Sequence, residues 1–146
     1  MRMKFGFILG IIAVAIFATS SLWAADPIVG KWKSIDDETK QEKSVMELYV
    51  QNGKVFGKVT QLLRAKDKGN VCDKCEGAEK GKPVEGMVIL KNMKDDGDQW
   101  AGGTILDPAK GKEYKCKMKA IEGGNKLEVK GCIAFFCRTQ VWVKVK

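Results

Sequence analysis

The chain has 146 residues, of which 45% are hydrophobic, and carries a formal net charge of +8 at neutral pH. It contains no histidine, which excludes Ser-His and Cys-His nucleophile pairs and removes the commonest metal ligand. After the first 25 residues the only arginines are Arg64 and Arg138, although arginine is the side chain that base-specific nucleic-acid readers favour. We therefore expect a protein that is not an enzyme, holds no metal or cofactor and does not bind nucleic acid.

Residues 1–24 have the layout of a secretory signal peptide. Two positive charges precede an apolar run from Phe5 to Ala18, and the chain then becomes small and polar. This run is too short for a comfortable membrane span. We expect cleavage near Ala24 or Ala25, a periplasmic or secreted protein, and a mature single domain over 25–146. Large residues precede the expected cleavage site, where small residues are preferred. The alternative is that the segment is not cleaved and stays as an N-terminal membrane anchor.

The mature chain divides into short runs separated by turn residues. The eight runs are 28–35, 44–51, 54–63, 87–93, 99–106, 112–121, 126–135 and 138–146. Asn52-Gly53 is a strong hairpin signal, and apolar residues alternate with lysines in Tyr114–Lys119. Such alternation through short turns is typical of an antiparallel meander, and eight strands can close and remove their exposed edges. We predict an all-β, antiparallel, up-and-down eight-stranded barrel, with an open β-sandwich as the alternative.

The segment 64–86 is the exception to the short turns. It is charged and rich in glycine, and it contains Pro83 and a Cys-x-x-Cys sequence formed by Cys72 and Cys75. Connections of this length inside a compact domain are usually lids, binding loops or disordered segments. We expect this loop to cover one end of the barrel.

Five cysteines leave at least one unpaired. Cys116 lies on the apolar face of its strand and Cys132 on the lysine face, which disfavours a disulfide between them. Spacing favours Cys72–Cys75 and Cys132–Cys137, with Cys116 as a buried free thiol.

Two other uses of the cysteines remain open. Cys72 and Cys75 would suit a redox protein, but no helix follows them as it does in thioredoxin-like sites. Together with Cys132 and Cys137 they would suit a zinc site, which an oxidising compartment disfavours.

Four segments together resemble a bacterial secreted family known as domain of unknown function 2147. They are Ile28–Lys33, Val71–Glu76, Trp100–Pro108 and Arg138–Trp142. The resemblance spans the mature chain and implies an exported single domain. It implies no catalytic residue.

Gly30-x-Trp32 and Arg138 are similar to the signature of lipocalin-like (calycin) barrels. The resemblance implies that Trp32 plugs the floor of the barrel and that the guanidinium of Arg138 packs over its ring, joining the first strand to the last.

Lipocalin-like barrels enclose small apolar molecules, so this resemblance implies an exported envelope protein that binds an apolar or lipid-like ligand. The residues expected to line the site are Met46, Leu48, Val50, Tyr114, Met118, Leu127 and Val129, with Gly102 and Gly131 leaving space. One alternative is a barrel filled by its own side chains that acts as a structural or interaction protein of the envelope. The second alternative is a redox protein that uses Cys72 and Cys75. We expect a monomer whose lysine-rich surface is attracted to anionic envelope surfaces.

Overall fold

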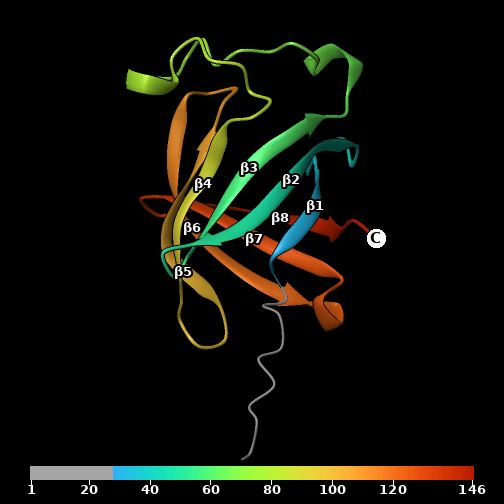
Figure 1. Ribbon diagram of the computed structural model, residues 1–146, viewed down its shortest axis with the longest axis vertical. Coiled ribbons are helices and arrows are strands. Elements are labelled where there is room, and N and C mark those ends of the chain that lie inside the picture. Colours follow the sequence, from blue (N-terminus) through green and yellow to red (C-terminus); the bar gives the residue numbers. More distant parts are fainter. Residues whose placement is uncertain (1–27) are drawn as a thin grey trace, which may run out of the picture.

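The computed structural model describes residues 28–146, so the predicted signal peptide and its cleavage site lie outside the described residues. Eight antiparallel strands form a closed barrel in which sequence neighbours pair and β8 returns to β1 (Figure 1). The strands are β1 (Gly30–Ile35), β2 (Glu42–Gln51), β3 (Lys54–Leu62), β4 (Val88–Asp95), β5 (Trp100–Asp107), β6 (Lys112–Ile121), β7 (Lys126–Ile133) and β8 (Phe136–Lys144). The predicted eight-stranded, up-and-down barrel is thus confirmed. Among residues 28–146, no helix combines the length and the apolar character needed to cross a membrane.

Local sequence chemistry explains these strands. In β6 the buried side chains of Cys116 and Met118 alternate with exposed lysines, because successive side chains of a strand point to opposite faces. Asn52 and Gly53 both have positive φ, at 52° and 72°, as the two-residue turn between β2 and β3 requires. The alternation of buried and exposed side chains and the turn residues therefore both indicate an antiparallel meander.

The connections between strands alternate between the two ends of the barrel. The β1–β2, β3–β4, β5–β6 and β7–β8 connections gather at one end, which we call the loop end. The three other connections lie at the opposite end, which we call the floor end. The long β3–β4 connection, with its short 3-10 helices η1 (Ala65–Asp67) and η2 (Gly77–Glu79), passes over the loop end at the top of Figure 1.

The interior of the floor end is filled by large side chains. Trp32 is fully buried, and its indole Nε1–H donates to the carbonyl of Ile28 at 2.8 Å. The other fully buried side chains of this half include Leu48, Val55, Met93, Met118, Leu127 and Trp142. Burying each large apolar side chain contributes about 1.5–3 kcal/mol, so this half holds much of the stabilising core.

The seam between β1 and β8 corrects the predicted role of Arg138. These strands pair at Trp32↔Lys144 and Lys33↔Val143, and just beyond β8 the Val145 N–H donates to the Lys31 carbonyl at 2.9 Å. The cation over the Trp32 ring is Lys144, whose Nζ lies 5.3 Å from the ring centroid. Arg138 lies six residues away, about 20 Å along β8 at roughly 3.3 Å per residue, and therefore cannot reach the indole. The predicted cation–π contact between the first and last strands therefore exists, but Lys144 makes it in place of Arg138.

Candidate functional site

The loop-end half of the barrel is hollow and contains a cavity of about 270 Å³. Trp142 lies at the boundary between this cavity and the filled floor, since it lines the space and pairs with Leu127, which is fully buried outside it. The apolar lining consists mainly of Met46, Val59, Leu62, Val84, Ile89, Ile105, Leu106, Tyr114 and Val129. The polar lining consists of Ser34, Lys43, Ser44, Asp107, Lys110, Arg138 and Gln140. A molecule in this space would therefore meet an apolar wall and a polar margin.

The only buried polar side chains in the described core, Ser34 and Ser44, satisfy each other. Their hydroxyl oxygens are 2.6 Å apart across the β1–β2 pair. No buried side-chain nitrogen or oxygen in residues 28–146 lacks a hydrogen-bond partner. Unpaired polar groups would favour water in the cavity. The buried core of residues 28–146 holds no such group, and the charged side chains of the lining, Lys43, Asp107, Lys110 and Arg138, form its polar margin.

A cluster of charged side chains bridges the seam at the loop end. Arg138 donates hydrogen bonds from Nε and Nη2 to the carboxylate of Asp37, the latter at 2.6 Å, and also contacts Glu38 at 3.2 Å. This hydrogen bonding holds the pKa of Asp37 below its ordinary value and raises that of Arg138. Toward the loop end, where β1 and β8 no longer pair through their backbones, the end of β1 and the start of β8 are therefore joined by these side chains. We call this cluster the seam clamp.

The same turn is held on its other side by Arg64. Asp36 accepts backbone hydrogen bonds from Thr39 at 2.9 Å and Glu38 at 3.1 Å, and Arg64 Nη1 donates to it at 2.9 Å. These hydrogen bonds, led by that from Thr39, hold the pKa of the Asp36 carboxyl well below its usual range. The β1–β2 turn is thus fixed between the end of β3 and the start of β8.

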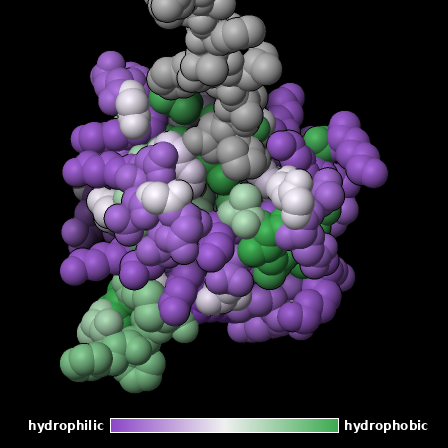
Figure 2. Space-filling view, turned by 90° about the horizontal axis from the view of Figure 1, so that it is seen from below, coloured by the Kyte–Doolittle hydropathy of each residue, from purple (hydrophilic) through white to green (hydrophobic). Residues whose placement is uncertain are grey.

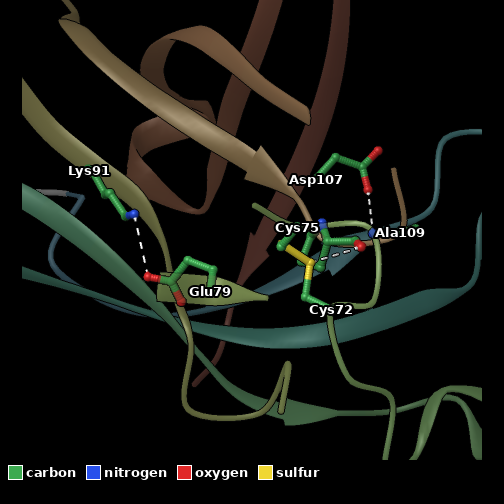
Figure 3. Close-up of a disulfide and its surroundings, with 7 residues drawn as sticks. Cys72, Cys75, Glu79, Lys91, Asp107 and Ala109 are labelled. Atoms are coloured by element: carbon green, nitrogen blue, oxygen red, sulfur yellow. Dashed lines mark hydrogen bonds and ion pairs between the residues drawn. A yellow bond between two sulfur atoms is a disulfide. The ribbon is translucent and has the colours of Figure 1, made fainter. Parts of the chain in front are cut away.

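The long β3–β4 connection is anchored by the Cys72–Cys75 disulfide (Figure 3). Cys72 and Cys75 are both buried, and Cys72 Sγ lies 3.3 Å from the Pro108 carbonyl oxygen in the β5–β6 connection. Farther along, Glu79 forms an ion pair with Lys91 of β4 at 3.8 Å. Burial of both sulfurs restricts their access to a redox partner, so the geometry supports a structural role for this disulfide.

The second disulfide, Cys132–Cys137, joins β7 to β8 next to their turn, and Cys116 is a buried free cysteine. Burial raises the pKa of the Cys116 thiol to about 12. Because the four other sulfurs form two separate disulfides, the structure contradicts the alternative of a shared zinc site.

Most of the predicted lining residues lie either in the cavity or in the filled floor half. Met46, Tyr114, Val129 and the space-leaving Gly131 line the cavity. Leu48, Met118 and Leu127 point inward but belong to the filled floor half.

Two of the predicted positions are wrong. Val50 is 52% exposed because it lies beside the β2–β3 turn, where the strand leaves the core. Gly102 lies outside the cavity with a positive φ of 75°. Its missing side chain relieves the backbone rather than enlarging the site.

Several cavity residues were missed by the sequence analysis. Val59 and Leu62 lie on β3, and Val59 continues the inward alternation of Val55 and Gly57, a signal that was available in the sequence. Val84 comes from the long connection, where no periodicity marks a residue as inward.

The closed eight-stranded antiparallel barrel has a lipocalin-like fold. The fold is similar to a solved structure described as "Protein HP1028 from the human pathogen Helicobacter pylori belongs to the lipocalin family", with a TM-score of 0.71, 17% sequence identity, and coverage of 81% of this chain and 82% of that one. More particularly, the chain belongs to the family described as "Uncharacterized protein conserved in bacteria (DUF2147)", whose model matches residues 30–144. No curated protein matches it in sequence.

Proposed function

We propose that this protein is an exported, non-enzymatic envelope protein that binds a small apolar or lipid-like molecule in its loop-end cavity. The observation that carries the proposal is the unequal filling of the barrel, with a solid floor half beneath a cavity of about 270 Å³. Ligand sites are typically apolar clefts of a few hundred Å³ with few polar groups, which this cavity resembles at the small end of the range.

The polar margin indicates an amphipathic ligand. Lys43 and Lys110 line the cavity, and neither forms an ion pair within residues 28–146. A ligand with an apolar body and one anionic group would bury the body against Val129 and Ile89 and direct the anion toward these lysines. Arg138 is less available because Asp37 already binds it.

Export is supported by the disulfides. Two disulfides in a bacterial chain of this size are typical of an oxidising compartment outside the cytoplasm. Intact mass spectrometry of protein recovered from cell envelopes should show a mature chain beginning at Ala25 or Asp26. A mass that includes Met1 would contradict cleavage.

Ligand binding can be tested with two valines that face opposite sides of the barrel wall. Val129 lines the cavity and is 3% exposed, whereas Val141 on β8 points outward and is 38% exposed. Val129→Trp should abolish one-to-one binding of the anionic apolar probe anilinonaphthalene sulfonate. Val141→Trp should leave the binding unchanged. Native mass spectrometry of gently purified protein should also show an added mass that organic extraction removes.

The alternative, a scaffold without a ligand, gives a different result. Neither a removable mass nor saturable probe binding would appear, and both tryptophan variants would behave as the parent. Thermal unfolding separates a filled cavity from a disrupted fold. If Val129→Trp unfolds, Gly131→Ala serves instead, because its new Cβ would lie 3.3 Å from the Tyr114 Cβ and narrow the cavity with little displacement.

A further inference from the structure

The turn between β7 and β8 carries large apolar side chains that nothing in the described chain covers. Phe135 is 99% exposed, Phe136 is 84% exposed and Ile133 is 40% exposed. We call these three residues the apolar tip. Figure 2 shows an apolar knob of this kind projecting from a surface that is otherwise mainly hydrophilic. Contiguous exposed apolar patches on soluble proteins usually mark interaction sites.

The apolar tip is held in place by its covalent neighbour. The Cys132–Cys137 disulfide lies directly behind it, with a Cα–Cα distance of 4.1 Å, and Ile133 pairs with Phe136 across the turn. Because the crosslink fixes the two strands, the phenylalanines are presented to solvent on a constrained hairpin. A constrained tip loses little conformational entropy when it is buried against a partner.

Three lysines on the outer wall beside the tip supply the second observation. Lys115, Lys117 and Lys130 are exposed, Lys117 is directly opposite Lys130, and Lys115 is opposite Cys132. We call them the lysine cluster. None of them forms an ion pair within residues 28–146, whereas Lys119 on the same face binds Asp98 at 3.4 Å. Like charges directly opposite in a sheet are destabilising, so the cluster is suited to an external anionic surface.

We propose that the apolar tip inserts into the interfacial layer of a lipid bilayer whose anionic headgroups contact the lysine cluster. Apolar aromatic side chains flanked by lysines are the combination that binds such an interface. Phe136 and Ile133 also line the cavity, so docking places the loop end of the barrel at the membrane surface. The proposal rests on the tip and the lysines and holds whether or not the cavity contains a ligand.

Vesicle co-sedimentation tests the apolar part. The mature protein should bind vesicles of phosphatidylglycerol and phosphatidylcholine and should bind phosphatidylcholine alone weakly. Phe135→Ser should lower the partition coefficient about tenfold, because burial of a phenylalanine ring drives insertion. Val141→Ser, an exposed apolar side chain on the outer face of β8, is the matched control and should bind as the parent. The melting curve of Phe135→Ser should be unchanged because its side chain is 99% exposed, and Val141→Ser should remain folded with at most a small loss of stability.

Charge reversal tests the electrostatic part. Lys115→Glu/Lys130→Glu should reduce partitioning into phosphatidylglycerol vesicles by about fivefold or more per site, since each surface lysine contributes roughly 1 kcal/mol to such binding. Lys94→Glu/Lys146→Glu makes the same change in net charge at exposed positions outside the cluster and should have a much smaller effect. Equal losses in the two double variants would show that only net charge matters and would overturn the proposal.

The remaining outcomes also decide the matter. Absence of vesicle binding would overturn the proposal, as would binding that Phe135→Ser leaves intact. If the parent forms dimers at micromolar concentration that Phe135→Ser converts to monomers, and the parent does not bind vesicles, the tip joins two copies of this chain and the membrane assignment is wrong.

Discussion

Removing either side of the seam clamp should weaken the barrel slightly and speed the release of a ligand from its cavity. Arg138 and Asp37 are joined by two hydrogen bonds across a seam whose strand pairing covers two positions, with one further backbone hydrogen bond from Val145 to Lys31. Arg138→Ala and Asp37→Ala each break this contact, and the double variant completes a thermodynamic cycle.

The expected magnitude follows from exposure. The side chain of Arg138 is 46% exposed and that of Asp37 is 25% exposed. Exposed ion pairs contribute about 0.2–1 kcal/mol, with paired hydrogen bonds at the upper end. We therefore expect a coupling free energy of about 1 kcal/mol near neutral pH. A clamp of that strength, once lost, should raise the rate of probe release from the cavity about fivefold, since 1.4 kcal/mol corresponds to tenfold.

The clamp should also depend on pH with a definite sign. Its hydrogen bond from Arg138 lowers the pKa of Asp37 in the folded state. The stabilisation is therefore complete above the ordinary carboxyl pKa of about 3.9 and is lost as the pH falls through the lowered value. The coupling free energy between Arg138 and Asp37 should therefore be constant near neutral pH and should decrease as the pH falls below about 3.9.

Urea unfolding of the four proteins gives the coupling free energy, and stopped-flow fluorescence of bound anilinonaphthalene sulfonate gives the release rate. The Lys33–Glu42 pair is the matched control, because it joins β1 to β2 at 2.9 Å on the outer wall with side chains 37% and 53% exposed. Lys33→Ala should change stability by a few tenths of a kcal/mol and leave probe release unchanged. Equal release rates for Arg138→Ala and the parent would refute the assignment of a clamp to this seam.

Three further predictions concern the core. Trp32→Phe should destabilise by about 2–3 kcal/mol in urea unfolding, because it leaves a void in the filled floor and removes the donor to the Ile28 carbonyl; a loss under about 0.5 kcal/mol would contradict a packed floor. Cys116 should resist iodoacetamide at pH 8.5 until the protein is denatured, since burial raises its pKa to about 12, and rapid native labelling detected by mass spectrometry would contradict its burial. Gly57→Ala should lower stability by about 1–3 kcal/mol, because the new Cβ would lie 2.9 Å from the Leu90 Cβ, which cannot rotate away; an unchanged melting temperature would show that β3 and β4 separate freely.

The strand pattern was predictable because it depends on local chemistry. Alternation in β6 and the Asn52-Gly53 turn each act over a few residues, and both occur in the structure as the sequence indicates. Alternation shows which face a side chain occupies, but it carries no information on height along the barrel axis. Tyr114 and Met118 both point inward from β6, yet Met118 belongs to the filled floor and Tyr114 to the cavity.

The partner of Arg138 was not predictable for a related reason. Asp37 is 101 residues away in the sequence, and the contact depends on the register with which β8 meets β1. A one-residue change in register moves every side chain to the opposite face, and no local signal determines which residues of the first and last strands face each other. The contact between the last strand and the Trp32 ring was predicted on the correct strands, but the residue that makes it is Lys144 rather than Arg138.

The uneven filling of the barrel has a consequence for its behaviour under hydrostatic pressure. Unfolding eliminates internal voids, so pressure favours the unfolded state in proportion to the empty volume. In this barrel that volume is concentrated beside Trp142, while Trp32 lies in the filled half. Compression should therefore alter the surroundings of Trp142 before those of Trp32, and a molecule that fills the cavity should raise the pressure at which the protein unfolds.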